Sequence, residues 1–505
     1  MARWSETAGS SGYAGKMVSA VQAMEEILVV ALGPHGRAVL MREPTGSFTM
    51  TRTGLEILRA CYSTPCPVSC VLLSSAQKLY QQCGDGVKGF VIQVSALLRR
   101  CSNSTRPNHV ARQLMFLHQS LHGLCVRTGQ HSSAGRLDPD ILQEVLVTFL
   151  TCRFPNLVAR SLAGLLSEWI PTLPGLKLAV CKFDLLCLHQ CSGCVADSRV
   201  RQGFCITRGA DNFLGPGLYD IRMLLLDDAH ADDGRFDSLD VQCEVNVLVG
   251  ELKSRKEPNT TDVSGTLLIT RAMLPDHAMF VLRQHRVSIV QGVLKEEMDF
   301  VYSSLVKNGE NMLHVRLELL GSKECTWLGL PGVSQLLLSA PTVSLGREYA
   351  RVSCDALKVV SQLEECSVLA ASGQFETSLL AHLRDRFKLQ PLQLATGSIA
   401  GRSKLVEWHQ KLNRASLSSE QNAGELSEVC EAIAGAFDGV DADVVEAVGH
   451  ALLAVVQKLP PTDGASGREP VALRLAVLQH ALATTQALLK VDAVVPVRTD
   501  GKQNM

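Results

Sequence analysis

The chain has 505 residues, of which 46% are hydrophobic and 20% charged, and its net charge is −1. This balance is that of a globular chain and excludes an intrinsically disordered one. The length exceeds what one core can organise, so we expect roughly two to four domains. The near-neutral charge provides no overall field for attracting nucleic acid or an anionic membrane.

The 17 cysteines are an odd number in a long chain, which favours reduced, mostly buried thiols in a cytosolic protein. The amino-terminal segment lacks the basic start and apolar core of a secretory signal. The apolar runs are too short to span a membrane. We therefore expect a cytoplasmic protein without membrane insertion.

The first hundred residues alternate between helical patterns and turn signals. Hydrophobic residues fall at helical spacing from Gly15 to Leu32, and Gly33 and Pro34 end that helix. Short strands are predicted at 38–41 and 47–51, on either side of a turn. Further helices are predicted over 54–62, 68–82 and 87–99.

The rest of the chain changes character twice. Residues 106–190 have mainly helical patterns, clearest at 141–150 and 157–170. From residue 198, short strand-like runs alternate with helical pieces, which indicates an α/β domain over roughly 195–340. These runs lie at 200–207, 221–227, 265–270 and 287–291, and the polar stretch 228–263 is expected to form a protrusion. Helices are predicted again over 347–369, 379–387, 426–437, 444–459 and 471–491. The order helical, α/β, helical suggests one domain inserted into another.

Two glycine-rich segments carry the most specific signal. They read Leu32-Gly33-Pro34-His35-Gly36-Arg37 and Gly84-Asp85-Gly86-Val87-Lys88. Turns of this kind let backbone N–H groups approach phosphate oxygens, which bulkier residues would obstruct. Their sequences and order resemble the two nucleotide loops of group II chaperonins, Leu-Gly-Pro-x-Gly and Gly-Asp-Gly-Thr-Thr. Further stretches resemble that superfamily in the same order: 51–58, 221–227, 285–291, 298–306, 351–360, 371–376, 469–471 and 484–495.

The resemblance implies a multidomain α+β fold of the chaperonin kind, with a helical equatorial domain, an intermediate domain and an inserted α/β apical domain. The implied boundaries are 1–130 and 373–505 for the equatorial domain, 131–197 and 341–372 for the intermediate domain, and 198–340 for the apical domain.

The resemblance also implies a set of site residues. Asp85 would hold Mg²⁺, and Asp355 would orient the attacking water if hydrolysis occurs. The implied nucleotide-binding residues are Leu32, Gly33, Pro34, Gly36, Gly84, Asp85, Gly86, Gly373 and Glu469.

The chain departs from the family pattern at several of these positions. Thr53 stands where the family has aspartate, and Val87 and Lys88 replace two hydroxyl residues. Ala371 and Ser372 replace two of three family glycines, which leaves less room for a nucleotide. We therefore expect at most weak or structural binding of ATP with Mg²⁺, without efficient hydrolysis, so that the protein is not an enzyme.

Each of these residues also has a structural interpretation. The glycine turns can persist because the fold needs them, and Asp355 can be an ordinary helix carboxylate. Lys88 can bind phosphate as a point charge or lie on the surface at a helix start.

The remaining cysteine and histidine groups are weak metal signals. Cys191 and Cys194 form a single Cys-x-x-Cys, which we interpret as free thiols in a loop rather than half of a zinc site or a redox pair. His118 and His122, with His109 near, are interpreted as solvated or capping side chains rather than ligands.

The resemblance is strongest to the divergent chaperonin-like branch linked to Bardet-Biedl syndrome. It implies an assembly chaperone that acts with related chaperonin-like Bardet-Biedl proteins and the CCT/TRiC ring, with BBSome subunits as clients and a role in ciliogenesis. It implies a location in the cytoplasm and at the cilium or basal body. Two alternatives stay open: an ATP-hydrolysing subunit of a folding ring, and a degenerate scaffold that binds no client.

Overall fold

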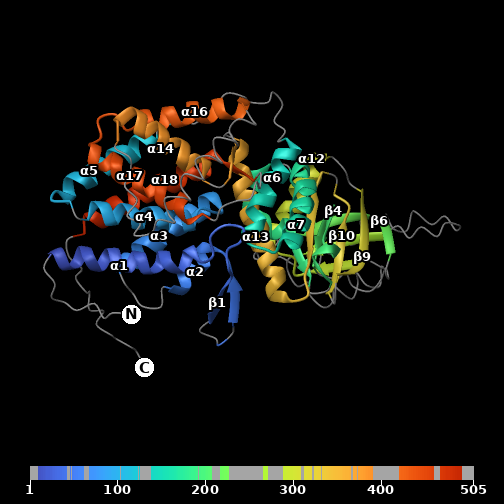
Figure 1. Ribbon diagram of the computed structural model, residues 1–505. Helices are drawn as coiled ribbons and strands as arrows, with labels where there is room; N and C mark the ends of the chain where they lie inside the picture. Colours follow the sequence, from blue (N-terminus) through green and yellow to red (C-terminus); the bar gives the residue numbers. More distant parts are fainter. Residues whose placement is uncertain are drawn as a thin grey trace, which may run out of the picture. The chain divides into compact units, whose positions relative to one another are not determined.

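The structure is a computed structural model. It describes residues 10–42, 46, 48–61, 67–102, 104–122, 124, 138–173, 175–190, 193–207, 217–226, 265–270, 288–308, 312–320, 323–330, 332–364, 368–371, 373–389, 420–459 and 467–491. The described chain is mixed α and β, mostly helical with a few small sheets (Figure 1). It divides into two compact units, which we call the helical unit (Met1–Ala163 with Asp355–Met505) and the sheet unit (Gly164–Cys354).

The first part of the helical unit contains six helices and one hairpin among the described residues. They are α1 (Ser10–Val29), β1 (Val39–Arg42), β2 (Phe48–Thr51), α2 (Gly54–Cys61), α3 (Pro67–Cys83), α4 (Val87–Cys101), α5 (Pro107–His122) and α6 (Pro139–Thr151). Helix α7 (Asn156–Trp169) then leads into the sheet unit.

The chain returns to the helical unit through α13 (Val343–Ser361). The elements that follow are β12 (Val368–Ala370), α14 (Gln374–Phe387), α16 (Glu420–Gly435), α17 (Ala442–Lys458), β13 (Arg468–Pro470) and α18 (Val471–Leu489). Strands β12 and β13 pair antiparallel, with Leu369 opposite Glu469.

Both ends of the chain build the core of the helical unit. Helix α4 is apolar on nearly every face, with Phe90 and Leu97 fully buried, as expected for a helix surrounded by protein. It contacts α1 from the amino-terminal side and α17 and α18 from the carboxyl-terminal side. Figure 1 shows these blue and red helices side by side. The core therefore closes only when segments more than three hundred residues apart meet.

The sheet unit is built from one continuous segment. Its larger sheet has the strand order β5-β10-β9-β6-β7-β8, parallel across β6-β7-β8 and antiparallel elsewhere. These strands are β5 (Phe204–Ile206), β6 (Gly217–Leu226), β7 (Gly265–Thr270), β8 (Ser288–Gln291), β9 (Met312–Leu320) and β10 (Lys323–Leu328), with α12 (Lys295–Asn308) between β8 and β9. A smaller sheet joins β3 (Cys187–Gln190), β11 (Ser334–Ser339) and β4 (Arg199–Gln202). Short helices α8 (Leu176–Cys181) and α9 (Phe183–Leu186) precede β3.

Most elements predicted from hydrophobic period and turn signals are found in the structure. The predicted helix 347–369 is wrong at its end, because α13 stops at Ser361 and Val368–Ala370 is a strand. Its partner β13 lies about a hundred residues further on, so tertiary pairing overrides the local pattern. Strands β9, β10 and β11 were not predicted. The protrusion at 228–263 lies outside the described residues, and the five-part domain division stays a prediction.

Within the described part of the chain, no helix combines the length and apolar character that crossing a membrane requires.

Candidate functional site

The second glycine turn (residues 84–86) joins α3 to α4. Gly84 and Gly86 have φ of 72° and 93°, in the left-handed region that favours glycine. Gly86 caps the start of α4, and its carbonyl accepts a hydrogen bond from the Phe90 N–H at 2.9 Å. The turn therefore has the conformation that its glycines predicted.

Close packing against α13 is a structural reason for a glycine at position 84. A Cβ at this position would lie 2.5 Å from the backbone oxygen of Asp355 and 3.1 Å from Cβ of Lys358. Only a hydrogen fits between the turn and α13. The fold thus requires this glycine whether or not a phosphate binds.

The carboxylate of Asp85 is paired with the guanidinium of Arg153, which follows α6. The Arg153 nitrogens lie 3.1 and 3.4 Å from the two Asp85 oxygens. Burial works to raise the pKa of Asp85, but Arg153, Lys88 and the Gly86 N–H outweigh it and hold the pKa below its ordinary value. Asp85 is therefore a carboxylate with an internal counter-ion.

Arg153 is almost fully enclosed, with a side chain 5% exposed. It also donates to the carbonyl oxygens of Gly84 and Phe149, both at 3.3 Å. Its guanidinium lies 3.8 Å from the centre of the Phe149 ring. One side chain thus holds the turn, its carboxylate and the end of α6 together.

Lys88 connects the two glycine turns. Its Nζ donates to the carbonyl oxygen of Ala31, at the end of the first helix, over 2.6 Å. A Cβ on Gly54 would lie 2.9 Å from Cγ of Lys88, so the lysine fills the space beside α2. Burial lowers the pKa of Lys88, although Asp85 opposes this effect. Lys88 therefore makes contacts within the protein.

Asp355 is buried near the start of the part of α13 that belongs to the helical unit. The Tyr80 hydroxyl donates to its Oδ2, and Lys358 Nζ lies 3.1 Å from its Oδ1. Burial raises the pKa of Asp355 against the influence of Lys358 and Tyr80. The carboxylate links α3 to α13.

Glu469 forms a second buried ion pair. Arg474 donates to both Glu469 oxygens, at 2.8 and 2.6 Å, and reaches Glu376 at 3.4 Å. Burial works to lower the pKa of Arg474, but Glu469, Glu376 and then Asp85 raise it, which also indicates that the Asp85 charge acts on this cluster. Gly373, with φ of 84°, caps α14 in the same unit.

The first glycine turn (residues 32–37) is different. Gly33 has φ of 75°, and a Cβ on Gly36 would lie 2.5 Å from the backbone of Ala31. The Arg37 N–H donates to the Val30 carbonyl at 2.8 Å, which closes the turn. Tight backbone packing therefore explains Gly36, and the positive φ explains Gly33.

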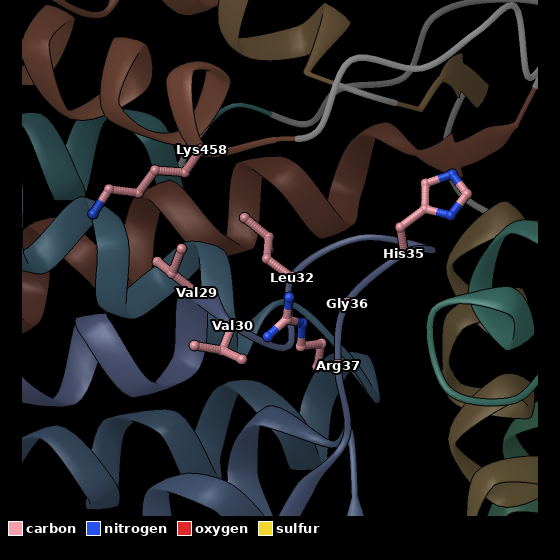
Figure 2. Close-up of a pocket in the computed structure, with 7 residues that line it drawn as sticks. All are labelled: Val29, Val30, Leu32, His35, Gly36, Arg37 and Lys458. Atoms are coloured by element: carbon pink, nitrogen blue, oxygen red, sulfur yellow. The ribbon is translucent and has the colours of Figure 1, made fainter.

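An open hollow of about 350 Å³ lies beside the first turn (Figure 2). It is lined by Val29, Val30, Leu32, His35, Gly36, Arg37 and Lys458. Figure 2 shows the Lys458 amine directed away from Arg37, and His35 projecting from the tip of the turn. Lys458 is also paired with buried Glu25. The cations around this hollow do not converge on one point, so it lacks the geometry of a phosphate site.

The three carboxylates predicted for nucleotide chemistry are brought into one unit, but all are already paired. Asp85 faces Arg153, Glu469 faces Arg474, and Asp355 faces Tyr80 and Lys358. A metal ion at Asp85 would have to displace a buried guanidinium. This arrangement does not fit Mg²⁺ with a bound nucleotide.

The counter-ions are the functional residues that sequence reasoning missed. Lys358 lies three residues after Asp355 on one helix, a spacing that could have indicated the pair. Arg474 follows Glu469 by five residues across the start of α18. Arg153 is 68 residues from Asp85, and no local pattern connects them.

The histidine and cysteine groups form no metal centre among the described residues. The rings of His118 and His122 make an edge contact at 6.2 Å, and His109 pairs with Asp441 at 2.5 Å. Cys194 is an exposed free thiol, whereas Cys191 lies outside the described residues.

Comparison with known proteins gives a partial match. No protein-family model matches the chain. A stretch of 93 residues, 18% of the chain, is 32% identical to the BBSome complex assembly protein BBS10 of Homo sapiens and covers 13% of it. A stretch of 89 residues, 17% of the chain, is 33% identical to the protein of the same name from Pongo abelii and covers 12% of it. The matched stretches thus span about an eighth of these curated relatives. The chain is similar to this assembly protein over a limited part of both sequences.

Proposed function

We propose that this chain is a chaperonin-like assembly chaperone that helps to build the BBSome, without efficient ATP hydrolysis. It acts with related chaperonin-like Bardet-Biedl proteins and the CCT/TRiC ring, and its clients are BBSome subunits. Its place of action is the cytoplasm, at the base of the cilium, where it supports ciliogenesis. The finer identification as a relative of the Bardet-Biedl syndrome 10 protein, with the equatorial, intermediate and apical layout, belongs to the same proposal.

The partial identity to the BBSome complex assembly protein BBS10 carries this proposal. The ordered chaperonin-like motifs support it, because Gly33, Gly36, Gly84 and Gly86 form tight turns where the resemblance requires nucleotide loops.

The state of the carboxylates favours holding and assembly over hydrolytic cycles. Hydrolysis of a phosphoanhydride needs a metal to bridge the phosphates and a group to orient water. Asp85 is paired with Arg153, and Asp355 is buried with Tyr80 and Lys358. Both carboxylates stabilise the fold in this arrangement.

Co-purification of the native protein from ciliated cells tests the assembly role. We expect the chain to bring down sister chaperonin-like proteins together with BBSome subunits. A closed ring made only of this chain, or a preparation without BBSome subunits, would contradict the proposal.

An assay with radiolabelled ATP tests the absence of hydrolysis. The controls are Asp85→Ala and Asp355→Ala, which remove the two carboxylates that the alternative, an ATP-hydrolysing folding subunit, would need. We expect the same background turnover from all three proteins. Turnover by the native chain that either substitution abolishes would favour the alternative.

A further inference from the structure

Three oxygen groups surround the buried guanidinium of Arg153 and pair with its two terminal nitrogens. These are the carboxylate of Asp85, at 3.1 and 3.4 Å, and the carbonyl oxygens of Gly84 and Phe149, both at 3.3 Å. A carboxylate with backbone carbonyls is the type of hard oxygen set that divalent cations such as Mg²⁺ and Mn²⁺ prefer. In this chain the guanidinium group lies between these oxygens.

We propose that Arg153 is a built-in cation that substitutes for a metal ion at the second glycine turn, and that its removal uncovers a latent divalent-cation site. The turn is then held closed by the chain itself, without metal or nucleotide. This inference deepens the proposed function and rests on its proposed lack of efficient ATP hydrolysis.

The burial of the Arg153 guanidinium supports its role as a substitute for a metal ion, since it is not an exposed surface ion pair. An exposed ion pair contributes little to folding stability. The Arg153 side chain is 5% exposed, and a buried charge of this kind needs close partners of opposite charge. The Asp85 side chain is 31% exposed, and the Lys88 amine donates to the Ala31 carbonyl rather than to this carboxylate. Loss of Arg153 therefore leaves Asp85 short of compensation.

The turn conformation makes the site ready for an ion. Gly84 is fixed against the Asp355 backbone, and Gly86 is fixed as the cap of α4. The backbone of the turn is hence held when Arg153 is shortened, and the Gly84 carbonyl and the Asp85 carboxylate would move inward from their distances to the guanidinium to reach a metal ion. The vacated volume is that of a guanidinium group, which also admits free guanidinium ion.

Manganese titration of the purified full chain tests this inference, with electron paramagnetic resonance reporting free Mn²⁺. Arg153→Ala is expected to bind one Mn²⁺ at least about tenfold more tightly than the native chain. The double variant Asp85→Asn with Arg153→Ala is expected to lose that binding. Arg160→Ala is the matched control, because Arg160 is an exposed arginine on α7 that contacts Asn156 and no carboxylate in the described contacts.

Chemical rescue gives an independent measurement. Millimolar guanidinium is expected to raise the melting temperature of Arg153→Ala, whereas equal concentrations of sodium chloride or urea are not. The double variant should show no such rescue. Arg153→Lys, which keeps the charge but loses the fork of donors, should lie between the native chain and Arg153→Ala.

Three results would overturn the inference. The first is that the native chain binds Mn²⁺ and that Asp85→Asn abolishes this binding, because the native site would then accept a metal ion beside Arg153. Another is Arg153→Ala that gains neither Mn²⁺ binding nor guanidinium rescue. If Arg153→Ala is recovered only as unfolded protein, refolding in guanidinium or Mn²⁺ replaces the titration, and failure of both ions counts against the inference. Loss of BBSome subunits in co-purification would contradict the proposed function and leave these cation results unchanged.

Discussion

The two glycine turns have similar backbones and different surroundings. Both contain glycines with positive φ, and in both a Cβ would meet backbone atoms at 2.5 Å. The first turn borders an open hollow, where His35 and Arg37 are exposed. The second encloses a carboxylate that a buried guanidinium neutralises.

Because of this difference, the glycines and the charges give separate information: the glycines indicate the backbone conformation, and the charges indicate what can bind. Glycines at these positions are explained by positive φ or by tight packing, so they say little about phosphate binding. The pairing of Asp85 with Arg153 reports how the site is used. Two glycine turns of similar backbone can therefore have different charges around them.

The largest expected effect comes from forcing the second turn open. Gly84→Ala should reduce the free energy of unfolding by about 3 kcal/mol, because positive φ is strained and the new Cβ meets the Asp355 oxygen. Urea unfolding measures the change. Gly46→Ala is the control, since Gly46 has φ of 87° with open space around it, and we expect a loss of about 1 kcal/mol there. Equal losses at the two positions would show that Gly84 does not depend on its contact with α13.

Removing one buried charge near the second turn should have the next largest effect. Glu469→Gln leaves Arg474 with Glu376, at 3.4 Å, as its ion-pair partner among the described residues, and we expect a loss of about 2 kcal/mol by urea unfolding. Glu446→Gln, at a carboxylate that is 47% exposed, is the control and should change stability by less than about 0.5 kcal/mol. A neutral result for Glu469→Gln would mean that the buried pair is not needed for folding.

Acid should weaken the second turn in a defined pH window. Because the folded pKa of Asp85 lies below its ordinary value of 3.8, the ionised carboxylate stabilises the fold above about pH 4. That contribution is lost as the pH falls through the folded pKa. The stability difference between the native chain and Asp85→Asn should be constant near pH 7 and shrink below about pH 4. A difference that grows on acidification would contradict the pairing.

The first turn should show the smallest effect. His35→Ala and Arg37→Ala alter exposed side chains at the hollow, so each should change the free energy of unfolding by less than about 0.5 kcal/mol. Differential scanning calorimetry measures this. A large loss would indicate that these side chains have structural roles like those beside the second turn.

Sequence pattern predicted the helices well because hydrophobic period is a local property. The helices α2 to α4 and α17 to α18 begin and end near the predicted residues, whereas α1 runs from Ser10 to Val29 rather than over the predicted Gly15 to Leu32. Strand β12 was missed, since it depends on pairing with β13 about a hundred residues later. The short run Val368–Ala370 carries no signal of that partner.

In the candidate site, too, local features could be predicted from sequence and long-range contacts could not. The turns at Gly33 and Gly84 could be predicted because glycine conformation is local. The pairing of Asp85 could not, because Arg153 reaches it only after α4, α5 and α6 have packed. The sequence shows that a carboxylate could bind a cation. Which cation it binds depends on the side chains that the fold places beside it.

The discontinuous helical unit has a consequence for synthesis. The sheet unit occupies one continuous segment, so it can fold as soon as that segment leaves the ribosome. Helix α4 must wait for α17 and α18, more than three hundred residues later. At roughly 5–20 residues per second, the apolar face that α17 and α18 cover stays open for tens of seconds on the nascent chain. A protein proposed to help others assemble therefore passes through a period in which it is itself a client.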